Sequence, residues 1–233
     1  MTQRGRNPNG RFGRPVDAVL FDLDGTLVDT APDMVAALTA LQAARGDVPV
    51  DYELARSNVS NGAAGLIRLA FPDVDEATRE LLHGNFLDRY RQTLAARSRV
   101  FPGLDALLDE LDRRGSPWGV VTNKPRALTD ALLAELALTP RLGCAISGDT
   151  LPQRKPHPAP MLLASRQLGV EPGRVVYVGD ALRDIEAGRA AGMATVAAGW
   201  GYITADDDPA AWQADVLVRT PDELTQLLVG ELG

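Results

Sequence analysis

Six short apolar segments constrain the fold of this chain more than any other feature of its sequence. They span residues 16–23, 118–122, 145–147, 175–178, 194–197 and 216–218. After residue 100 they alternate with helical patterns at residues 104–114, 128–138, 161–168, 185–191 and 221–228. Strands that alternate with helices in this way are joined by right-handed crossovers and form a parallel sheet. We therefore expect an α/β fold built on a parallel sheet.

The region before residue 100 interrupts this alternation. From Pro32 to Arg99 apolar residues recur at helical spacing, for example Met34, Leu38 and Leu41, and no strand pattern is evident. The start of the chain combines Arg with Gly, Asn and Pro without any periodicity, which is typical of a flexible segment. Three parts are therefore expected: a flexible tail (1–14), a core domain (15–29 and 100–233) and an inserted helical domain (30–99).

The composition excludes several classes of protein. The chain has 233 residues, of which 45% are hydrophobic, so it can bury a substantial core. Its net charge of -7 disfavours nucleic-acid and anionic-membrane binding, because an acidic surface repels both polyanions. No segment reaches the ~18 apolar residues of a membrane span, and no secretory signal is evident. We expect a cytoplasmic protein that binds a small molecule, and the sequence gives no indication of its oligomeric state.

Two residue types are rare enough to examine one by one. Cys144 is the only cysteine, which rules out an internal disulfide, and its apolar neighbours predict core packing rather than a catalytic thiol. Lys124 and Lys155 are the only lysines in a chain that otherwise uses arginine. We attribute Lys124 to chance, whereas Lys155 lies in a candidate functional motif.

Two carboxylates follow the first apolar segment. Asp22 and Asp24 are one residue apart, so in a strand their side chains point to the same side. Two like charges this close require a cation, a proton or a phosphate to offset their repulsion. Gly25 and Thr26 then turn the chain and offer backbone N–H groups to an anion. The segment predicts a metal site that handles phosphate.

Further carboxylates follow a later strand. Asp180 comes directly after the strand at residues 175–178, and Asp184 lies one helical turn further on. Ligands of open parallel sheets bind beyond the carboxyl ends of the strands, so these groups are expected to meet Asp22 and Asp24. Mg²⁺ prefers oxygen ligands, and Asp22, Asp180 and the backbone carbonyl of Asp24 match that preference. Asp184 is expected to orient metal-bound water or the Lys155 ammonium.

Three other residues are candidates for phosphate binding. Thr122 and Asn123 follow the second strand of the predicted sheet and can donate hydrogen bonds to phosphate oxygens. Lys155 lies in the sequence Arg-Lys-Pro-His-Pro, in which two prolines restrict the backbone. Its ammonium can neutralise both a phosphate and Asp22.

Each of these motifs has a purely structural alternative. Thr122 and Asn123 fit helix capping ahead of Pro125, and Asp180 fits a helix N-cap. Asp184 fits a solvated helix face, and Asp29 is interpreted as a cap only. What favours the functional interpretation is the order and setting of the motifs together.

The combination resembles the haloacid dehalogenase superfamily of phosphotransferases. The matching segments are Asp22-Leu-Asp24-Gly-Thr26, Val121-Thr-Asn-Lys124, Lys155-Pro-His-Pro158 and Gly179-Asp-Ala-Leu-Arg-Asp184. The resemblance implies a Rossmann-like parallel sheet core, an all-helical cap inserted after the first motif, and Mg²⁺ as cofactor. It implies that Asp22 is the nucleophile and Asp24 the general acid/base. It also implies phosphate binding by Thr122 and Lys155 and a metal site completed by Asp180 and Asp184.

These features predict a phosphomonoester hydrolase that works through an aspartyl-phosphate on a small phosphorylated metabolite. A carboxylate at Asp24 favours an ester over a carbon–halogen substrate, because the ester leaving group needs a proton. A phosphomutase and a catalytically idle, metal-binding regulator remain as alternatives. Within the superfamily the chain resembles the phosphoglycolate phosphatase-like group. Its segment Gly199-Trp-Gly-Tyr-Ile203 favours the N-acetylmuramic acid 6-phosphate phosphatase branch, which serves cell-wall (peptidoglycan) sugar recycling, with 2-phosphoglycolate as the alternative substrate.

The helical insertion is expected to select the substrate, because the core contacts only the phosphate. A Gly-rich turn at residues 57–65 precedes a helix, so Asn61 and Gly62 are possible substrate contacts, with a plain helix start as the alternative. Arg68 and Arg183 are further possible contacts. Arg68 and Arg183 also fit solvated surface positions. The two histidines, His83 and His157, are assigned capping or surface roles.

Overall fold

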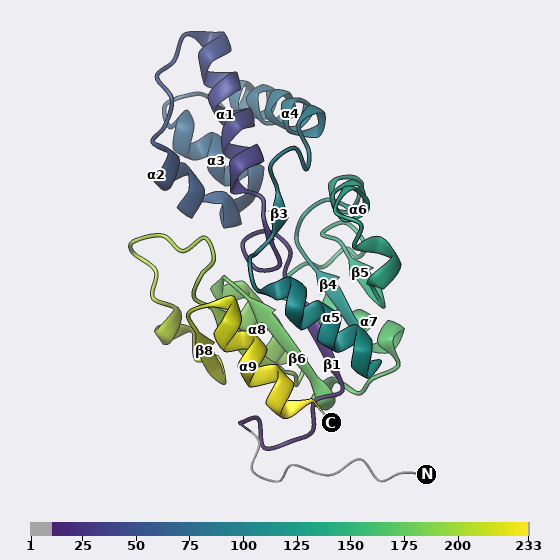
Figure 1. Cartoon of the computed structure of the whole chain (residues 1–233). Coiled ribbons are helices and arrows are strands. Elements are labelled where there is room, and N and C mark those ends of the chain that lie inside the picture. Colours follow the sequence, from purple (N-terminus) through teal and green to yellow (C-terminus); the bar gives the residue numbers. More distant parts are fainter. Residues whose placement is uncertain (1–10, 233) are drawn as a thin grey trace.

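A parallel sheet forms the centre of the molecule (Figure 1). The structure, a computed structural model, describes residues 11–232. Within that range six parallel strands pair in the order β5-β4-β1-β6-β7-β8. The strands are β1 (Ala18–Phe21), β4 (Trp118–Val121), β5 (Cys144–Ile146), β6 (Val175–Gly179), β7 (Ala194–Ala198) and β8 (Val216–Val218). The predicted α/β class and the Rossmann-like parallel sheet are confirmed.

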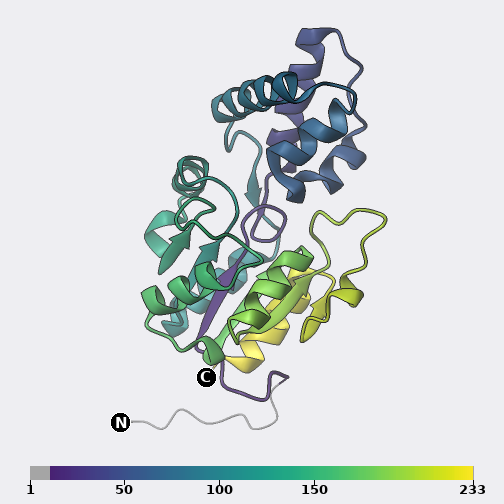
Figure 2. The ribbon, with the colours of Figure 1, turned by 180° about the vertical axis from the view of Figure 1, so that it is seen from behind.

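Helices cover both faces of this sheet, as Figures 1 and 2 show from opposite sides. α5 and α9 pack against one another on one face, and α7 and α8 contact β4 to β7 on the other. The alternation of β1 matches this arrangement, since Val19 and Phe21 join the core on the first face, and Ala18 and Leu20 the core on the second. The core helices are α5 (Leu104–Arg114), α6 (Arg126–Glu135), α7 (Ala159–Leu168), α8 (Leu182–Ala190) and α9 (Pro221–Glu231), with short 3-10 turns η2 (Thr139–Arg141), η3 (Pro172–Arg174) and η4 (Pro209–Trp212).

A group of helices is inserted after β1 and lies beyond one end of the sheet (Figure 1). It consists of α1 (Ala31–Arg45), α2 (Tyr52–Ser57), η1 (Val59–Asn61), α3 (Gly62–Ala70) and α4 (Glu76–Gln92). Its interior is apolar, and Leu66, Phe86 and Leu82 are almost fully buried there. The helical character predicted for this region is confirmed, whereas the boundaries at residues 30 and 99 stay a prediction.

Two short strands join the insertion to the sheet, and the sequence pattern did not indicate them. β2 (Val28–Asp29) pairs antiparallel with β3 (Arg99–Val100). Asp33 in the first turn of α1 reinforces this junction, because its buried carboxylate accepts the backbone N–H groups of Arg97 and Ser98. The chain therefore enters and leaves the insertion at one place.

The described part of the tail runs along the far end of the core. Arg11 donates its backbone N–H to the carboxylate of Glu231, and Arg14 donates to the carbonyl of Gly192. Residues 1–10, which make up most of the predicted flexible tail, lie outside the described residues. No helix between residues 11 and 232 combines the length and apolar character needed to cross a membrane.

Candidate active site

The predicted catalytic segment lies where β1 ends, at the end of the sheet that faces the insertion (Figure 1). Asp22 is 3% exposed and Asp24 is half-buried. The chain then turns at Gly25, whose φ of 84° favours glycine. A Cβ at this position would lie 2.2 Å from Asp180 Oδ2, and a Cβ at Gly201 would lie 2.2 Å from Asp180 Cβ. These two glycines therefore make room for the Asp180 side chain.

Three carboxylates converge behind this turn. Asp22, Asp180 and Asp184 each offer an oxygen, and these oxygens all lie within 4.8 Å of one another. Asp184 is 0% exposed, so it does not lie on a solvated helix face, and the N-cap of α8 is Ala181 rather than Asp180. Asp184 accepts the Ala181 N–H at 3.0 Å in addition to facing the cluster. The carboxylates that the sequence assigned to a metal site are brought together, with Asp184 among them.

Hydrogen bonds hold Asp180 in place from three directions. Its Oδ1 accepts the Thr26 hydroxyl at 3.1 Å, while its Oδ2 accepts the Tyr202 N–H at 2.9 Å and the Ser60 hydroxyl at 2.7 Å. Burial, reinforced by the charges of Asp22 and Asp184, raises the pKa of Asp180 to about 7. The raised pKa reflects repulsion between neighbouring negative charges, and a bound cation would relieve that repulsion.

Lys155 compensates part of this charge. Its Nζ lies 2.8 Å from Asp22 Oδ1 and 2.7 Å from Asp184 Oδ1, and it donates to the Tyr177 hydroxyl at 2.9 Å. The side chain is only 1% exposed. Asp22 Oδ1 still accepts no well-directed hydrogen bond from the described residues. The three carboxylates carry more negative charge than this ammonium neutralises, so a divalent cation with oxygen ligands fits the cluster.

Asn123 fixes the loop that carries Lys155. Its side-chain oxygen accepts the Lys155 N–H at 3.0 Å, and its side-chain nitrogen donates to the Lys155 carbonyl at 3.0 Å. Thr122 is buried, and its hydroxyl oxygen accepts the Lys124 N–H at 3.2 Å. Neither residue caps α6, whose first N–H, that of Arg126, donates to another side chain. Phosphate binding by Thr122 and Asn123 stays a prediction.

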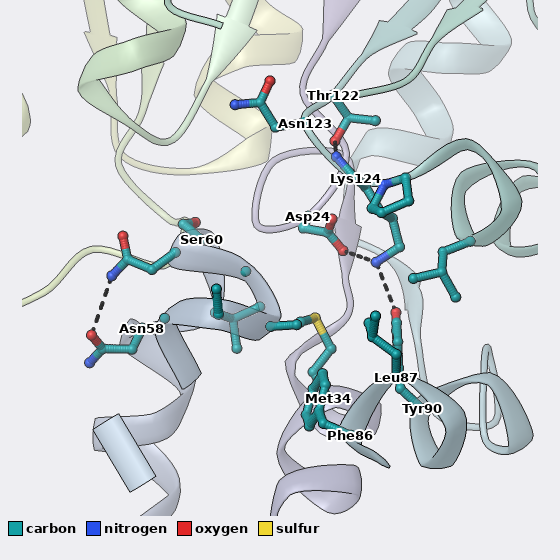
Figure 3. A pocket seen from close by; sticks show the side chains of 18 of the residues that line it. Asp24, Met34, Asn58, Ser60, Phe86, Leu87, Tyr90, Thr122, Asn123 and Lys124 are labelled. Carbon is teal, nitrogen blue, oxygen red and sulfur yellow. Dashed lines mark hydrogen bonds and ion pairs between the residues drawn. The ribbon is translucent and has the colours of Figure 1, made fainter. Parts of the chain in front are cut away.

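The attribution of Lys124 to chance is wrong. Its Nζ lies 2.9 Å from Asp24 Oδ1 and 3.0 Å from the Tyr90 hydroxyl, and its side chain is 5% exposed (Figure 3). Thr30 donates its hydroxyl to the same Asp24 oxygen at 2.7 Å. The signal available in the sequence was that a chain nearly devoid of lysine places one directly after the Thr-Asn pair.

The interpretation of Asp29 as a helix cap is also wrong. Thr30 is the residue before α1, and it makes no side-chain capping bond. The Asp29 carboxylate instead accepts the hydroxyl of Tyr202 at 2.6 Å, and the same hydroxyl oxygen accepts the Ala31 N–H. Tyr202 thus links the base of the insertion to Asp180. Its position in the Gly-Trp-Gly-Tyr segment gave no indication of this contact.

A cavity of about 750 Å³ opens between the insertion and the sheet (Figure 3). The core lines it with Asp22, Asp24, Thr122, Asn123 and Lys124. The insertion lines it with the predicted contacts Asn61, Gly62 and Arg68, together with His83, Phe86 and Tyr90. The arrangement places predicted catalytic residues and predicted substrate contacts around one space.

Four assignments outside the central motifs can be compared with the structure. Arg183 is half-buried and donates to the Ser60 carbonyl at 2.7 Å, so its interpretation as a solvated residue is wrong. His83 is half-buried and lines the cavity rather than lying on the open surface. His157 accepts the Ala159 N–H through Nδ1, which confirms a capping role. Cys144 is buried, which raises the pKa of its thiol to about 12, and this confirms core packing.

An α/β sheet with buried carboxylates at its carboxyl edge, an ammonium among them and a cavity in front of them is typical of an enzyme that acts on phosphate esters. The haloacid dehalogenase-like hydrolase family matches residues 16–192, and the chain belongs to this family. Its relatives identify it as a phosphoric monoester hydrolase.

Three similar proteins illustrate the relationship. The phosphoglycolate phosphatase of Xanthomonas campestris pv. campestris is 48% identical over 92% of this chain and 96% of its own length. The N-acetylmuramic acid 6-phosphate phosphatase of Pseudomonas aeruginosa is 45% identical over 91% of this chain and 94% of its own. A crystal structure of a predicted phosphoglycolate phosphatase from Haemophilus somnus 129pt has a TM-score of 0.81 and 25% identity, and it covers 91% of this chain and 98% of that one.

Proposed function

We propose that the protein is a magnesium-dependent phosphatase that hydrolyses N-acetylmuramic acid 6-phosphate through an aspartyl-phosphate on Asp22. The observation that carries the proposal is the cluster of Asp22, Asp180, Asp184 and Lys155 at the cavity of about 750 Å³. The cluster combines a cation site with an ammonium. Both are needed to bind a phosphate beside a carboxylate.

The metal would be held by the carboxylates of Asp22, Asp180 and Asp184 and by the backbone carbonyl of Asp24. Hard oxygen donors of this kind suit Mg²⁺ better than the softer transition metals. When bound, Mg²⁺ would supply positive charge that attracts the phosphate oxygens and stabilises the negative charge that develops in the transition state. Mg²⁺ in place of another divalent cation is part of the proposal.

The side chains divide the reaction into two half-reactions. In the first, an Asp22 oxygen attacks phosphorus, the bond from phosphorus to the ester oxygen breaks, and Asp24 donates a proton to the departing oxygen. In the second, water attacks the aspartyl-phosphate and gives its proton to Asp24, and inorganic phosphate leaves while Asp22 is regenerated. Lys155 and Thr122 bind the transferring phosphoryl group throughout, and Asn123 keeps Lys155 in place.

The size of the cavity supports the larger substrate. Pockets of about 300 to 1,000 Å³ enclose ligands of drug size, and N-acetylmuramic acid 6-phosphate falls in that class whereas 2-phosphoglycolate fills a small part of about 750 Å³. Arg68 and Arg154 line the cavity and suit the carboxylate that both compounds carry. We therefore assign Arg68, Asn61 and Gly62 to contacts with the sugar.

A second candidate substrate is 2-phosphoglycolate. It is favoured by the names of the relatives that are 46% to 48% identical to this chain, which are phosphoglycolate phosphatases. The two candidates share the chemistry of the phosphate end and differ in what fills the rest of the cavity. Discrimination between them is therefore expected to depend on the insertion.

We assign the role of a cap to residues 30–99. Ser60 from this region donates to Asp180, and its carbonyl accepts Arg183 from the core, so the insertion and the cluster are in direct contact. A cap that shields an aspartyl-phosphate from bulk water limits its breakdown by the wrong acceptor. The enzyme is proposed to act on a free small molecule in the cytoplasm.

The test is a comparison of kcat/KM for both phosphates with Mg²⁺ present, by phosphate release. We expect N-acetylmuramic acid 6-phosphate to be the better substrate, and Asp22→Asn to abolish turnover while circular dichroism and the thermal midpoint stay near those of the wild type. A higher kcat/KM for 2-phosphoglycolate would transfer the assignment to that compound. Full activity of Asp22→Asn would refute the mechanism. Release of no phosphate, even from an aryl phosphate, would favour a regulator, and phosphate transfer to a sugar would favour a mutase.

A further inference from the structure

A chain of contacts runs from the inserted helices to Asp24 through Lys124. Tyr90 near the end of α4 accepts a hydrogen bond from Lys124 Nζ at 3.0 Å, and the same Nζ lies 2.9 Å from Asp24 Oδ1 (Figure 3). The ammonium also lies over the Tyr90 ring, 4.7 Å from its centroid. The phenol therefore contacts the ammonium through both its hydroxyl and its aromatic face.

Burial strengthens the contact between Lys124 and Asp24. The side chain of Lys124 is 5% exposed and that of Asp24 16%, so water competes little for either charge. Burial alone would lower the pKa of Lys124, but the contacts with Asp24 and Tyr90 outweigh it and raise that pKa. Lys124 is therefore a cation at neutral pH, held by two partners from different parts of the chain.

The contacts leave one oxygen of Asp24 available. Oδ1 accepts the Thr30 hydroxyl at 2.7 Å and lies against the Lys124 ammonium. Oδ2 accepts no hydrogen bond from residues 11–232, and Asp24 lines the cavity. A carboxylate anchored through one oxygen cannot rotate freely, so its second oxygen is presented in one direction.

We propose that Lys124, held by Tyr90, is a positioning residue that orients the Asp24 carboxyl group for proton transfer, so that α4 of the insertion contributes to the first half-reaction. The inference rests on the role of Asp24 in the proposed function. In that half-reaction the Asp22–phosphorus bond forms, the phosphorus–oxygen ester bond breaks, and the proton passes from Asp24 to the ester oxygen. Lys124 exchanges no proton in this step; it fixes the orientation of the donor.

Two substitutions separate the contribution of Tyr90 from that of Lys124. Tyr90→Phe removes the hydroxyl and keeps the ring that stacks on Phe86, at 6.2 Å between centroids. Lys124→Met removes the charge and keeps most of the side-chain volume. Tyr52→Phe is the matched control, because Tyr52 is a cap tyrosine that is 43% exposed.

The readout is the release of the leaving group in a single turnover, with enzyme in excess and Mg²⁺ present. An alkyl phosphate needs a proton on its leaving oxygen, whereas p-nitrophenyl phosphate loses a stable phenolate without one. Tyr90→Phe is expected to slow alcohol release about tenfold and Lys124→Met about 100-fold, with nitrophenolate release slowed less than about threefold. Because Tyr90 acts through Lys124, the double variant is expected to be no slower than Lys124→Met alone. KM for the alkyl ester is expected to stay within about twofold of the wild type.

Three results would overturn the inference: equal losses on both esters, multiplying effects of the two substitutions, or a change in KM with an unchanged rate of alcohol release. If Lys124→Met does not fold, the selectivity of Tyr90→Phe for the alkyl ester decides the question. Failure of the proposed function is distinguishable, because it would appear as wild-type enzyme inactive on both esters or as an active Asp22→Asn variant. Wild-type rates for Tyr52→Phe show that a cap tyrosine as such is not required.

Discussion

The metal-free protein is expected to lose stability as the pH rises from 5 to 8, because of Asp180. Its carboxylate is buried next to Asp22 and Asp184, which raises its pKa from 3.8 to about 7. The folded state therefore binds a proton that the unfolded chain has already released. Stability from this group is fully present below about pH 4 and is lost as the pH passes through about 7.

The size of the effect follows from the two pKa values. A pKa that moves from 3.8 to about 7 corresponds to a loss of about 2 to 3 kcal/mol between pH 5 and pH 8. For a domain of this length that corresponds to roughly 5 to 10 °C in the thermal midpoint. The proposed Mg²⁺ site consists of ionised carboxylates of the folded state, so adding Mg²⁺ is expected to restore most of the loss at pH 8.

The assay is urea unfolding at pH 5 and pH 8, in EDTA and in Mg²⁺, for the wild type and Asp180→Asn. The asparagine keeps the shape of the side chain, and its amide can donate to the Thr26 hydroxyl, which is able to accept. The variant is expected to show a smaller fall between the two pH values, by about 2 kcal/mol, and a weaker response to Mg²⁺. An identical fall in both proteins would refute the reasoning, because the histidines and other carboxyl groups are common to both.

Three other perturbations test separate parts of the structure. Lys155→Arg is expected to lower kcat at least about 100-fold with the fold intact, because the bulkier guanidinium does not fit beside Asp22, where the Lys155 side chain is only 1% exposed. A near-normal kcat would show that a compact ammonium is not needed. Gly25→Ala is expected to raise the Mg²⁺ concentration needed for half-maximal activity about tenfold or more, because its Cβ would lie 2.2 Å from Asp180; an unchanged Mg²⁺ titration would contradict this. Phe86→Ala is expected to destabilise the protein by about 3 to 5 kcal/mol in urea unfolding, and a loss below about 1 kcal/mol would mean that the insertion repacks.

The sheet and the acidic cluster could be predicted because their signals are local. The apolar run at β1 is completely buried, and Asp22 follows it at a strand end, where topology rather than detailed packing decides its neighbours. The same rule predicted that Asp180 and Asp184 lie at this edge of the sheet, and the structure places them there beside Asp22. Helix bounds differ by a few residues, as for α6, which begins at Arg126 rather than at residue 128.

The contacts that the sequence did not indicate are those made between distant elements. Ser60 and Asp180 are separated by 120 residues, and Tyr202 contacts Asp29 across 173. Such pairs depend on how the insertion is seated on the sheet, and no periodicity encodes that orientation. The contact between Lys124 and Tyr90 is of the same kind, because Tyr90 lies in α4 and other helices and strands separate it from Lys124 along the sequence.

The paired strands β2 and β3 have a consequence for how relatives of this enzyme can diverge. Val28 lies opposite Val100, so the two ends of the inserted segment are adjacent, and Asp33 fastens them together. A segment whose ends meet can lengthen, shrink or be replaced without shifting the register of the sheet. Natural variation, or a laboratory transplant of the whole segment, can therefore change the residues that this segment contributes to the cavity while the sheet and its carboxylates stay unchanged.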